Sequence, residues 1–265
     1  MNKLKSIFLQ TNTACNASCK ICPYVKYYKD KPVKKMSLKL LEKILTDLTP
    51  KYYGEIGFYF QYEPLCDKRL AEILKLAKIL CPCSRTVIST NAASLNKVWR
   101  QRLVDCKSLD VVYFNILGGN EETYEKMMPP LKWDNMMNNV WEFSKVFKGK
   151  MYVNFIKTNE NKDSISELVS MLPENVSVIS KYWASDRAGA VKIDKPRFAE
   201  TRYKNKDQCL QLNKNVFIYY DGKVPLCCHC WNREVIIGDL NKENIYDLFE
   251  SDKKHFNYKI CKECD

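Results

Sequence analysis

Three cysteines near the start of the chain are spaced for metal chemistry. Cys15, Cys19 and Cys22 lie in the stretch QTNTACNASCKICPY with the spacing C-x3-C-x2-C. A structural zinc site commonly takes four ligands from two C-x2-C pairs. No fourth cysteine or histidine lies nearby, since the next sulfur along the chain is that of Met36. Three thiolates on one loop instead suit a four-iron, four-sulfur cluster with one iron open to a small molecule.

A second group of cysteines lies near the end of the chain. Cys209 and Cys227 form the pattern C-x12-G-x4-C around Gly222, and Cys261 and Cys264 add a C-x2-C pair. Four thiols from two distant segments can close a metal site, for which a zinc ribbon is the structural alternative.

Three further side chains in this region are surplus to a four-ligand site: Cys228, His229 and Cys230. They could be alternative ligands, inert structural groups or a hydrogen donor, because a thiol has a weak S–H bond that can quench a carbon radical. The packing around a cysteine decides its reactivity. The remaining cysteines, at positions 66, 81, 83 and 106, lie in or beside apolar stretches and are interpreted as small core residues.

Composition indicates a folded protein without a membrane span. Hydrophobic residues make up 46% of the 265 positions, and no apolar segment reaches the ~18 residues of a membrane helix. The first apolar run, IFL, is too short for a signal peptide. We therefore expect a cytoplasmic protein, in which clustered cysteines act as metal ligands or reactive thiols rather than in disulfides.

The chain carries a formal net charge of +12, and part of it is local. Lysines at positions 20, 26, 29, 31, 34 and 35 crowd the first cysteine group. Such a patch is either a solvated surface or a docking face for an acidic electron carrier, an anionic substrate or nucleic acid.

The elements that must position the first cysteine loop alternate along the chain. Apolar runs predict strands at 5–11, 55–61, 85–90, 109–115, 151–156 and 176–182. Helical periodicity occurs at 37–48, where Ser37 is the expected N-cap, and at 68–80, 95–105, 120–128, 133–147 and 164–172. This alternation predicts an α/β fold with a parallel sheet, a partial (β/α)6 TIM-like barrel. Chemistry in such folds gathers at the carboxyl ends of the strands, and the loop 15–22 follows the first strand directly.

The pattern changes after about residue 195. Two short strands within 215–227 flank Asp221-Gly222, which is a hairpin signal, and a helix is expected at 241–251. We predict a partial barrel over 1–195 and a small C-terminal appendage over 196–265. An appendage of this size usually needs a metal to hold it together.

With its C-x3-C-x2-C loop after the first strand, the chain resembles the radical S-adenosylmethionine (radical SAM) superfamily. The resemblance implies that the open iron of a [4Fe–4S] cluster binds the amino and carboxylate groups of SAM. Reductive cleavage of SAM would then give methionine and a 5′-deoxyadenosyl radical that abstracts hydrogen from a substrate.

Shorter motifs follow later strands in the family's order. QYEPLC at 61–66 is similar to a Gly-Gly-Glu-Pro motif, which implies that Glu63 accepts a hydrogen bond from the SAM amino group. Tyr62 departs from this motif, since glycine is usual there. STNA at 89–92 looks like the family's Thr-Asn-Gly motif and places Ser89 and Asn91 near the ribose.

Three more SAM contacts follow from the same resemblance. NILGGNEETYEKM at 115–127 is similar to a Ser-containing family segment, with Asn115 where serine is common. SDRAGAV at 185–191 resembles an Arg-Ala-Gly segment and contributes Arg187. Ile21, just before Cys22, would pack on the adenine.

The C-terminal cysteines resemble the SPASM appendage of radical SAM enzymes. The further cysteines of a full SPASM domain are absent, so the region is similar to the shortened Twitch form. That resemblance implies a second, auxiliary [4Fe–4S] cluster held by Cys209, Cys227, Cys261 and Cys264.

These resemblances imply a radical SAM oxidoreductase that acts on an unactivated C–H bond of a polar substrate. We expect a two-electron oxidation in which the auxiliary cluster accepts an electron, because Twitch relatives include an aminocyclitol dehydrogenase of about this length. The substrate would be a small molecule of the sugar or aminocyclitol type or a peptide, and it could be anionic. A flavodoxin or ferredoxin would supply electrons.

Two other reactions fit the same resemblance. An epimerase would use Cys230 or Cys228 as hydrogen donor, and a peptide maturase would crosslink a ribosomal peptide. Only 14 residues precede Cys15, which speaks against a leader-binding domain. A non-enzymatic electron carrier or a zinc-bound nucleic-acid module leaves the open cluster position and the barrel pattern unexplained, so we do not expect nucleic-acid binding.

Overall fold

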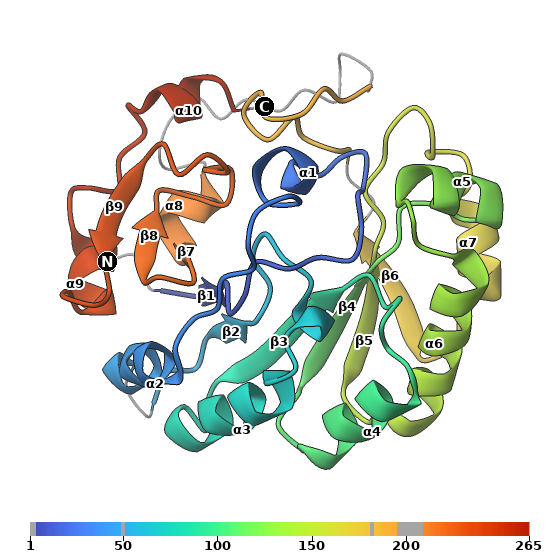
Figure 1. The fold of residues 1–265 in the computed structure, drawn as a ribbon, viewed down its shortest axis with the longest axis horizontal. Coiled ribbons are helices and arrows are strands. Elements are labelled where there is room, and N and C mark those ends of the chain that lie inside the picture. The colour runs from blue at the N-terminus through green and yellow to red at the C-terminus, as the bar shows by residue number, and fades with distance from the viewer. Residues whose placement is uncertain (1–3, 49–50, 181–182, 195–208, 265) are drawn as a thin grey trace.

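Seven parallel strands form the central sheet of the part that the computed structural model describes, residues 4–48, 51–180, 183–194 and 209–264. The strands are β1 (Ser6–Leu9), β2 (Glu55–Gly57), β3 (Arg85–Thr90), β4 (Val111–Asn115), β5 (Lys150–Asn154), β6 (Val176–Ser180) and β7 (Asn215–Ile218). Their order in the sheet is β6-β5-β4-β3-β2-β1-β7 (Figure 1). The first six strands therefore lie side by side in chain order, which is the arrangement of a partial barrel.

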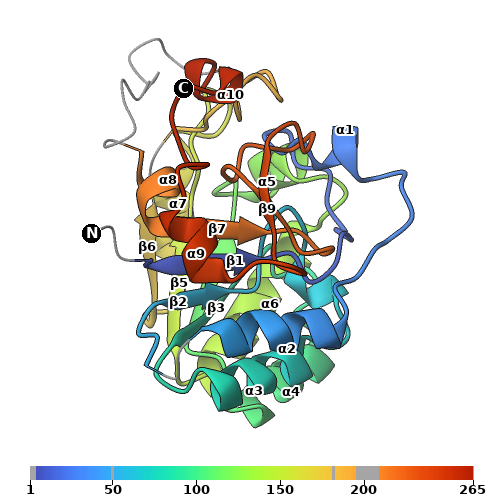
Figure 2. The same cartoon turned by 90° about the vertical axis from the view of Figure 1, so that its left-hand side faces the viewer.

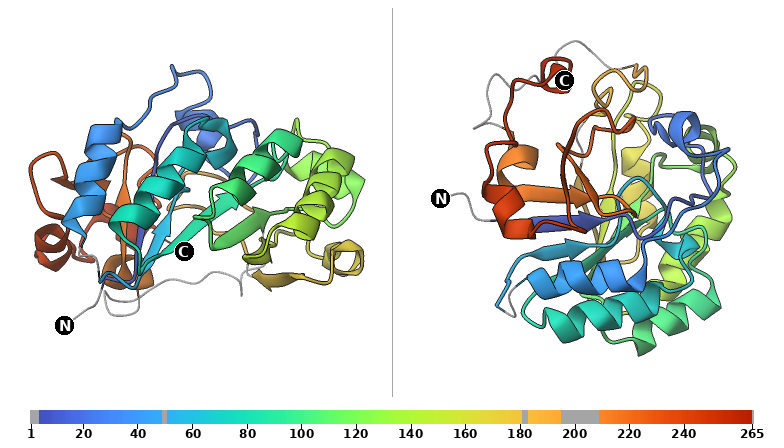
Figure 3. Two further views of the ribbon diagram at one scale, coloured as in Figure 1. Left: turned by 90° about the horizontal axis from the view of Figure 1, so that it is seen from below. Right: turned by 60° about the vertical axis from the view of Figure 1, so that its left-hand side comes forward.

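Helices connect these strands and cover the convex face of the sheet, as the view from below shows (Figure 3). They are α2 (Leu38–Asp47), α3 (Leu70–Leu80), α4 (Lys97–Asp105), α5 (Glu121–Met127), α6 (Trp133–Val146) and α7 (Ile165–Met171). The expected N-cap is confirmed, because the Ser37 hydroxyl accepts from the Leu40 N–H at 3.1 Å. Asn96 and Asn120 cap α4 and α5 in the same way.

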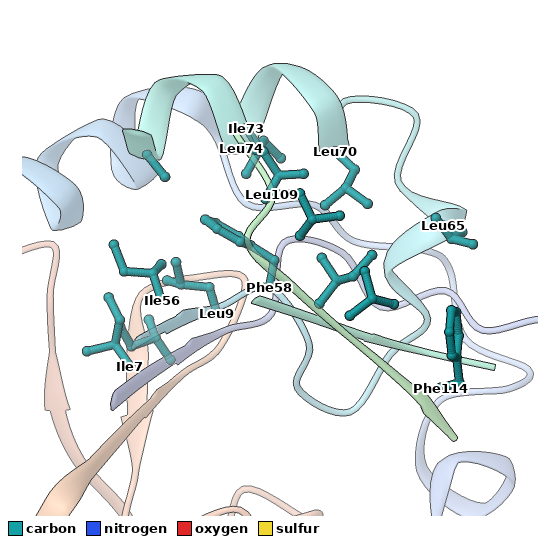
Figure 4. Close-up of a cluster of buried hydrophobic side chains, with 14 of the residues drawn as sticks. Ile7, Leu9, Ile56, Phe58, Leu65, Leu70, Ile73, Leu74, Leu109 and Phe114 are labelled. Carbon is teal, nitrogen blue, oxygen red and sulfur yellow. The ribbon is translucent and has the colours of Figure 1, made fainter. Parts of the chain in front are cut away.

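The core lies between the sheet and these helices (Figure 4). Ile7 and Ile56 sit opposite one another in the β1–β2 register and are fully buried. Leu70, Leu74 and other apolar residues of α3 pack toward the same strands (Figure 4). Helices on one side and loops on the other leave little of these strands in water, which explains their continuous apolar sequence.

The segment after β2 differs from the expected strand 55–61. β2 ends at Gly57, although the Phe58 N–H still donates to the Val87 carbonyl at 2.8 Å. Gln61 then adopts a left-handed backbone with φ of 58°, and a 3-10 turn follows at Pro64–Cys66. A strand cannot continue through these conformations, so the chain leaves the sheet at the point where its motif begins.

The C-terminal region begins with α8 (Leu210–Lys214) and continues through β7, β8 (Lys223–Pro225), β9 (Ile236–Asp239), α9 (Ile245–Glu250) and α10 (Lys259–Lys262). It lies beside β1 at one edge of the molecule, as the turned view shows (Figure 2). The expected turn is present, since Gly222 has φ of 83° and the Tyr219 N–H donates to the Lys223 carbonyl at 2.9 Å. The expected pairing of its two strands is wrong.

β7 joins the main sheet beside β1, in the register Ile7↔Val216, whereas β8 pairs with β9 in a separate antiparallel sheet. The apolar strand NVFI extends the buried face that β1 leaves uncovered, and this burial outweighs local hairpin pairing. The expected α/β fold is confirmed, with a seventh strand added. The expected domain boundary at 195/196 lies outside the described residues and remains a prediction.

Two smaller expectations are resolved by the fold. Cys81 and Cys106 are buried core residues as expected, but Cys83 is exposed and Cys66 is half-buried. Cys83 follows the Pro82 turn after α3, where the chain returns to the surface. Among the described helices, none has the length and apolarity needed to span a membrane.

Candidate active site

A cavity of about 250 Å³ opens at the carboxyl ends of the parallel strands. Its walls come from the carboxyl ends of β3 and β4, from segments that follow the strands β1 to β6, and from one residue of the C-terminal region, Trp231. All nine side chains expected around the first cluster and SAM line it: Cys15, Cys19, Ile21, Cys22, Glu63, Ser89, Asn91, Asn115 and Arg187. The structure thus brings together residues spread over more than half of the sequence.

The cysteine loop after β1 is tied down at both ends. The Tyr24 hydroxyl accepts from the Cys15 N–H at 2.9 Å, and the Cys22 N–H closes a turn on the Cys19 carbonyl at 3.0 Å. Between the cysteines, the Ser18 N–H donates to the Pro129 carbonyl in the α5–α6 connection at 2.6 Å, and the Lys20 N–H donates to the carbonyl of Met127, the last residue of α5, at 3.0 Å. These bonds satisfy the loop's backbone inside the protein and hold its thiols toward the cavity.

The three thiols of this loop lie in a place where thiolates are unfavourable without a nearby cation. Burial, followed by the charge of Glu63, raises the pKa of Cys15 far above its usual range. Burial followed by the Cys22 charge does the same to the pKa of Cys19, and burial raises the pKa of Cys22. A metal cluster would supply the positive charge that makes three buried thiolates stable together.

The arrangement of possible metal ligands in the described residues differs from that of a single-ion site. Within the described residues, no three His, Cys, Asp or Glu side chains are arranged to hold a single metal ion. A four-iron cluster distributes its cysteines over separate iron atoms, so its ligands need not converge on one point.

Glu63 is the carboxylate in the wall of the cavity, and it is held by three donors. Its Oε1 accepts from the Thr90 hydroxyl at 2.5 Å and from the Leu65 N–H at 3.1 Å, and its Oε2 accepts from the Asn91 N–H at 2.9 Å. Burial raises the pKa of Glu63 to about 7, against these hydrogen bonds, which lower it. A bound ammonium group would favour the ionised carboxylate further.

The motif around Glu63 contains a strained residue that sequence reasoning did not single out. Gln61 has the left-handed backbone that favours glycine, whereas Tyr62, the departure noted in the sequence, does not. Gln61 Oε1 accepts from the Tyr28 hydroxyl at 3.0 Å, and its Nε2 donates to the Cys228 carbonyl at 3.5 Å. The first glycine position of the motif would have been the signal for this conformation.

Polar side chains at the ends of β3, β4 and β5 form a connected row. Asn154 Nδ2 donates to Asn115 Oδ1 at 3.3 Å, and Asn115 Nδ2 donates to the Ser89 hydroxyl at 2.8 Å. Asn91 Nδ2 donates to Asn16 Oδ1 at 2.7 Å, which links β3 to the cysteine loop. The row fixes side chains that can offer oxygens and amides to a ligand with hydroxyl groups.

Two further expected SAM contacts differ in character. Ile21 is buried in the wall and offers an apolar surface. Arg187 is half-buried in a turn after β6, where its φ is 56°, and its positive charge lowers the pKa of Cys22 behind the larger effects of burial and a backbone hydrogen bond. A guanidinium in this position can attract a carboxylate of a bound molecule.

The four C-terminal cysteines lie close enough to influence one another. Burial, followed by the charge of Cys227, raises the pKa of Cys261 and that of Cys264 to about 12. The charge of Cys209 adds to the effect at both thiols, and Cys209 itself is buried. Two distant segments therefore bring four thiols together, of which Cys209 and Cys261 are buried and Cys227 and Cys264 are half-buried. This grouping fits a second cluster by the same charge argument.

The surplus side chains of this region occupy different environments. Cys230 is fully buried, and a hydrogen bond with it is the largest cause that raises the pKa of Cys227. Cys228 packs beside Phe60 and Phe217. The residues that line the cavity include neither Cys228 nor Cys230.

His229 and Trp231 point to contacts that sequence reasoning missed. Burial, followed by the charge of Arg187, lowers the pKa of His229 to about 3, so the ring is neutral. Trp231 lines the cavity and is buried, and its Nε1–H has no hydrogen-bond partner within the described residues. An acceptor on a bound molecule would satisfy this donor. The sequence singled out His229 only as a surplus side chain and did not single out Trp231, so only the fold reveals these contacts.

Comparison with known protein families identifies the class of protein. The model of the radical SAM superfamily matches residues 9–172, and the model of the SPASM iron–sulfur cluster-binding domain matches residues 209–265. The chain therefore belongs to the radical SAM superfamily and carries a SPASM-type C-terminal region. No curated protein sequence matches the chain.

Solved structures share the fold at low sequence identity. BtrN in complex with AdoMet and 2-DOIA is 19% identical with a TM-score of 0.68, and the match covers 100% of this chain and 94% of that one. Streptococcus suis SuiB bound to the precursor peptide SuiA is 16% identical with a TM-score of 0.76, over 96% of this chain and 66% of SuiB. Native anSMEcpe with bound AdoMet is 14% identical with a TM-score of 0.69, over 94% of this chain and 81% of that one.

The two matched families imply [4Fe–4S] clusters and SAM as cofactors. The residues present fit both groups, since three thiols share a cavity with polar and apolar contacts for a ligand and four more thiols gather in the C-terminal region. The expected family, fold and cofactors are confirmed. The individual ligand and SAM-contact residues remain predictions.

Proposed function

We propose that this protein carries out a two-electron oxidation of a polar substrate at an unactivated C–H bond. The observation that carries the proposal is the position of the C-terminal region, which contributes Trp231 to the wall of the cavity that the first cysteine group also lines. A substrate in this cavity would lie between the expected SAM site and the expected auxiliary cluster. When bound, the first cluster and SAM supply a 5′-deoxyadenosyl radical.

The atoms and electrons of this oxidation balance with the groups expected at the site. The substrate loses one hydrogen atom to the radical, one proton to a base and one electron to the auxiliary cluster, so its C–H carbon ends in a double bond to oxygen or nitrogen. Cys209, Cys227, Cys261 and Cys264 would hold that cluster. In an oxidation, the auxiliary cluster has the role of electron acceptor. A reaction that leaves the product unoxidised would not need such an acceptor.

The wall of the cavity favours a substrate with hydrogen-bond acceptors. The unpartnered Trp231 Nε1–H and the Arg187 guanidinium are both donors, and the row from Ser89 to Asn154 offers more polar groups. These groups match a sugar-like or aminocyclitol-like molecule, or an anionic one. A peptide substrate is the alternative of this proposal. We propose a flavodoxin or ferredoxin as the reductant, and no role for nucleic acid.

Epimerisation and peptide crosslinking are the alternative reactions. In an epimerase, Cys230 or Cys228 would donate hydrogen to the substrate radical. Cys230 is fully buried, and the groups that line the cavity include neither thiol, so oxidation is the better-supported reaction. Crosslinking shares the oxidation's need for an electron acceptor and differs in substrate.

Deuterium transfer tests the proposal. Anaerobic protein with SAM, a reductant and a candidate substrate deuterated at the reacting carbon should transfer deuterium into 5′-deoxyadenosine. The released product should be two mass units lighter than the unlabelled substrate. In the Cys228→Ala and Cys230→Ala variants, turnover should persist with the same oxidised product. An unoxidised product that carries one solvent deuterium, formed from unlabelled substrate in heavy water, would instead establish an epimerase.

A further inference from the structure

His229 lies between the cavity and the expected auxiliary cluster. Its Nε2 is 3.5 Å from Arg187 Nη1, and its Nδ1 is 3.3 Å from the Sγ of Cys264. Arg187 lines the cavity, and Cys264 is one of the four expected cluster ligands. One imidazole ring therefore contacts a cavity residue on one side and a ligand thiol on the other.

The chemistry of Arg187 decides which nitrogen of His229 carries the proton. A guanidinium has only N–H donors and no acceptor. His229 Nε2 must therefore be the acceptor of the pair, so the ring proton sits on Nδ1. That Nδ1–H faces the sulfur of Cys264 and can donate to it. The arrangement is the one that outer hydrogen bonds commonly impose on a histidine at a metal site, where the partner of one nitrogen fixes the role of the other.

We propose that His229 is a positioning residue of the auxiliary cluster: its Nδ1–H donates to the Cys264 sulfur, and Arg187 fixes this tautomer from the cavity side. The proposal rests on the proposed function, because it needs a cluster at the C-terminal cysteines. His229 acts through Cys264 and is not itself a ligand.

The consequence concerns the reduction potential of the auxiliary cluster. Reduction adds negative charge to the cluster and its thiolates, so a hydrogen bond to a ligand sulfur stabilises the reduced form more than the oxidised form. His229 should therefore raise the potential and make the cluster a better electron acceptor. An anionic group bound in the cavity could pair with Arg187 and break its contact with His229 Nε2. The Nδ1–H tautomer would then no longer be fixed, and the potential of the cluster would fall. Binding in the cavity would therefore change the cluster potential.

The chain offers a clean spectroscopic test because it contains only two histidines. The second, His255, stacks on Tyr258, with ring centroids 4.1 Å apart, and its Nδ1 accepts from the Asn257 N–H. Protein with 15N-labelled histidine and with Cys15, Cys19 and Cys22 replaced by Ala would hold the auxiliary cluster alone. Pulsed EPR of the reduced cluster should detect one weakly coupled histidine nitrogen, which His229→Phe abolishes and His255→Phe leaves in place.

Redox titration of the same proteins gives the second readout. His229→Phe should lower the equilibrium constant for reduction of the cluster by about tenfold. For one electron, this corresponds to a midpoint potential that is about 59 mV lower. His229→Asn, whose amide can donate from the place of Nδ1, should retain most of the potential. His255→Phe should match the parent protein.

Three results would overturn the proposal. A strongly coupled histidine nitrogen would show that His229 is a direct ligand. The absence of any coupling would show that there is no hydrogen bond. Equal potentials in the Phe and Asn variants would show that the hydrogen bond does not affect the potential. Failure of the proposed function looks different: the triple cysteine variant would then hold zinc or no iron, and no cluster signal would appear. If His229→Phe does not fold, the His229→Asn protein and the labelled parent still decide the hydrogen bond.

Discussion

One loop after β1 supplies all three cysteines of the first site, whereas two distant segments supply the four of the second. The first site opens on a cavity of about 250 Å³, while in the second Cys209 and Cys261 are buried among apolar residues. Under the proposed ligand assignment, the first arrangement would leave one cluster iron for a ligand, and the second would close its cluster with four thiols. The difference supports the proposal that the first cysteine group serves SAM binding and the second serves electron storage.

The largest effects should come from removing each site in turn. Replacing Cys15, Cys19 and Cys22 together by Ala should halve an iron content of about eight per chain and abolish SAM cleavage, because two four-iron clusters are expected. Replacing Cys209, Cys227, Cys261 and Cys264 by Ala should also halve the iron but leave SAM cleavage in place, with loss of oxidised product.

Iron analysis and chromatography of 5′-deoxyadenosine measure these outcomes on anaerobically reconstituted protein. Loss of SAM cleavage in both variants would contradict the proposal that only the first cysteine group is needed for SAM cleavage. Zinc at the C-terminal cysteines of anaerobically purified protein would contradict the auxiliary cluster directly.

The next effect concerns SAM binding at the first site. Glu63→Gln should weaken SAM affinity by roughly ten- to a hundredfold, because a hydrogen bond to a charged group is worth about 1.5–3 kcal/mol. Cluster content should stay unchanged. Calorimetric titration of the reconstituted protein measures the affinity, and Glu174→Gln on the exposed surface is the matched control.

The pH dependence of SAM affinity gives the same contact a second test. Burial raises the pKa of Glu63 to about 7, and the ionised form is the one that attracts an ammonium group. Affinity should therefore fall about tenfold per pH unit as pH drops below 7 and level off above it. Glu63→Gln should flatten this slope, and a slope that persists in the variant would assign the titration to another group.

A smaller effect is expected at the lysine patch that we propose as the docking face for the reductant. Lys26, Lys29 and Lys31 are exposed beside the cysteine loop, whereas Lys20 is paired with Glu160 at 2.7 Å. Changing these three exposed lysines to Glu should slow flavodoxin-driven SAM cleavage by about tenfold or more at low salt, since steered association depends on charge.

Salt should slow the wild-type reaction with flavodoxin and leave the triple variant nearly unaffected, because added ions screen the attraction. Lys51, Lys75 and Lys148 are exposed away from the cysteine loop, and their change to Glu is the matched control. Equal rates in all three proteins would show that the lysine patch serves another partner. Cleavage driven by a small chemical reductant should not change.

Much of the first site could be predicted from sequence because its spacing is local. The cysteine loop, Glu63 and Asn91 each lie in the segment after a strand, and the carboxyl ends of parallel strands meet at one edge. The second site could be predicted only as a set of thiols. Its cysteines are separated along the chain by segments whose path depends on tertiary packing, such as β7 joining β1 instead of β8.

The junction between the two regions was not predictable from spacing at all. The Arg187–His229 contact joins residues 42 positions apart in sequence, and it depends on where the turn after β6 meets the C-terminal region. Trp231 reaches the cavity for the same reason. Sequence patterns report local periodicity and motif spacing, whereas contacts between irregular loops follow from the packing of the whole molecule.

The smallest effect tests Gln61, where the two regions also meet. Gln61 keeps a left-handed backbone and joins Tyr28 to the Cys228 carbonyl through its side-chain amide. Both Gln61→Ala and Gln61→Gly lose these bonds, but only Ala retains the steric cost of the backbone, about 1–2 kcal/mol. The Gly variant should therefore be more stable than the Ala variant by about 1 kcal/mol, after the greater chain entropy of glycine is subtracted.

Urea denaturation of the three proteins measures this difference. At Lys148, which is exposed and lies outside the set of left-handed residues, the order should reverse and Ala should be the more stable substitution. Hydrogen exchange in the segment around Cys228 should rise equally in both Gln61 variants, because each loses the amide that contacts this segment. Equal stability of Gln61→Ala and Gln61→Gly would show that the left-handed backbone at Gln61 does not cost measurable free energy. Unchanged hydrogen exchange near Cys228 would show that the Gln61 side chain does not stabilise this segment.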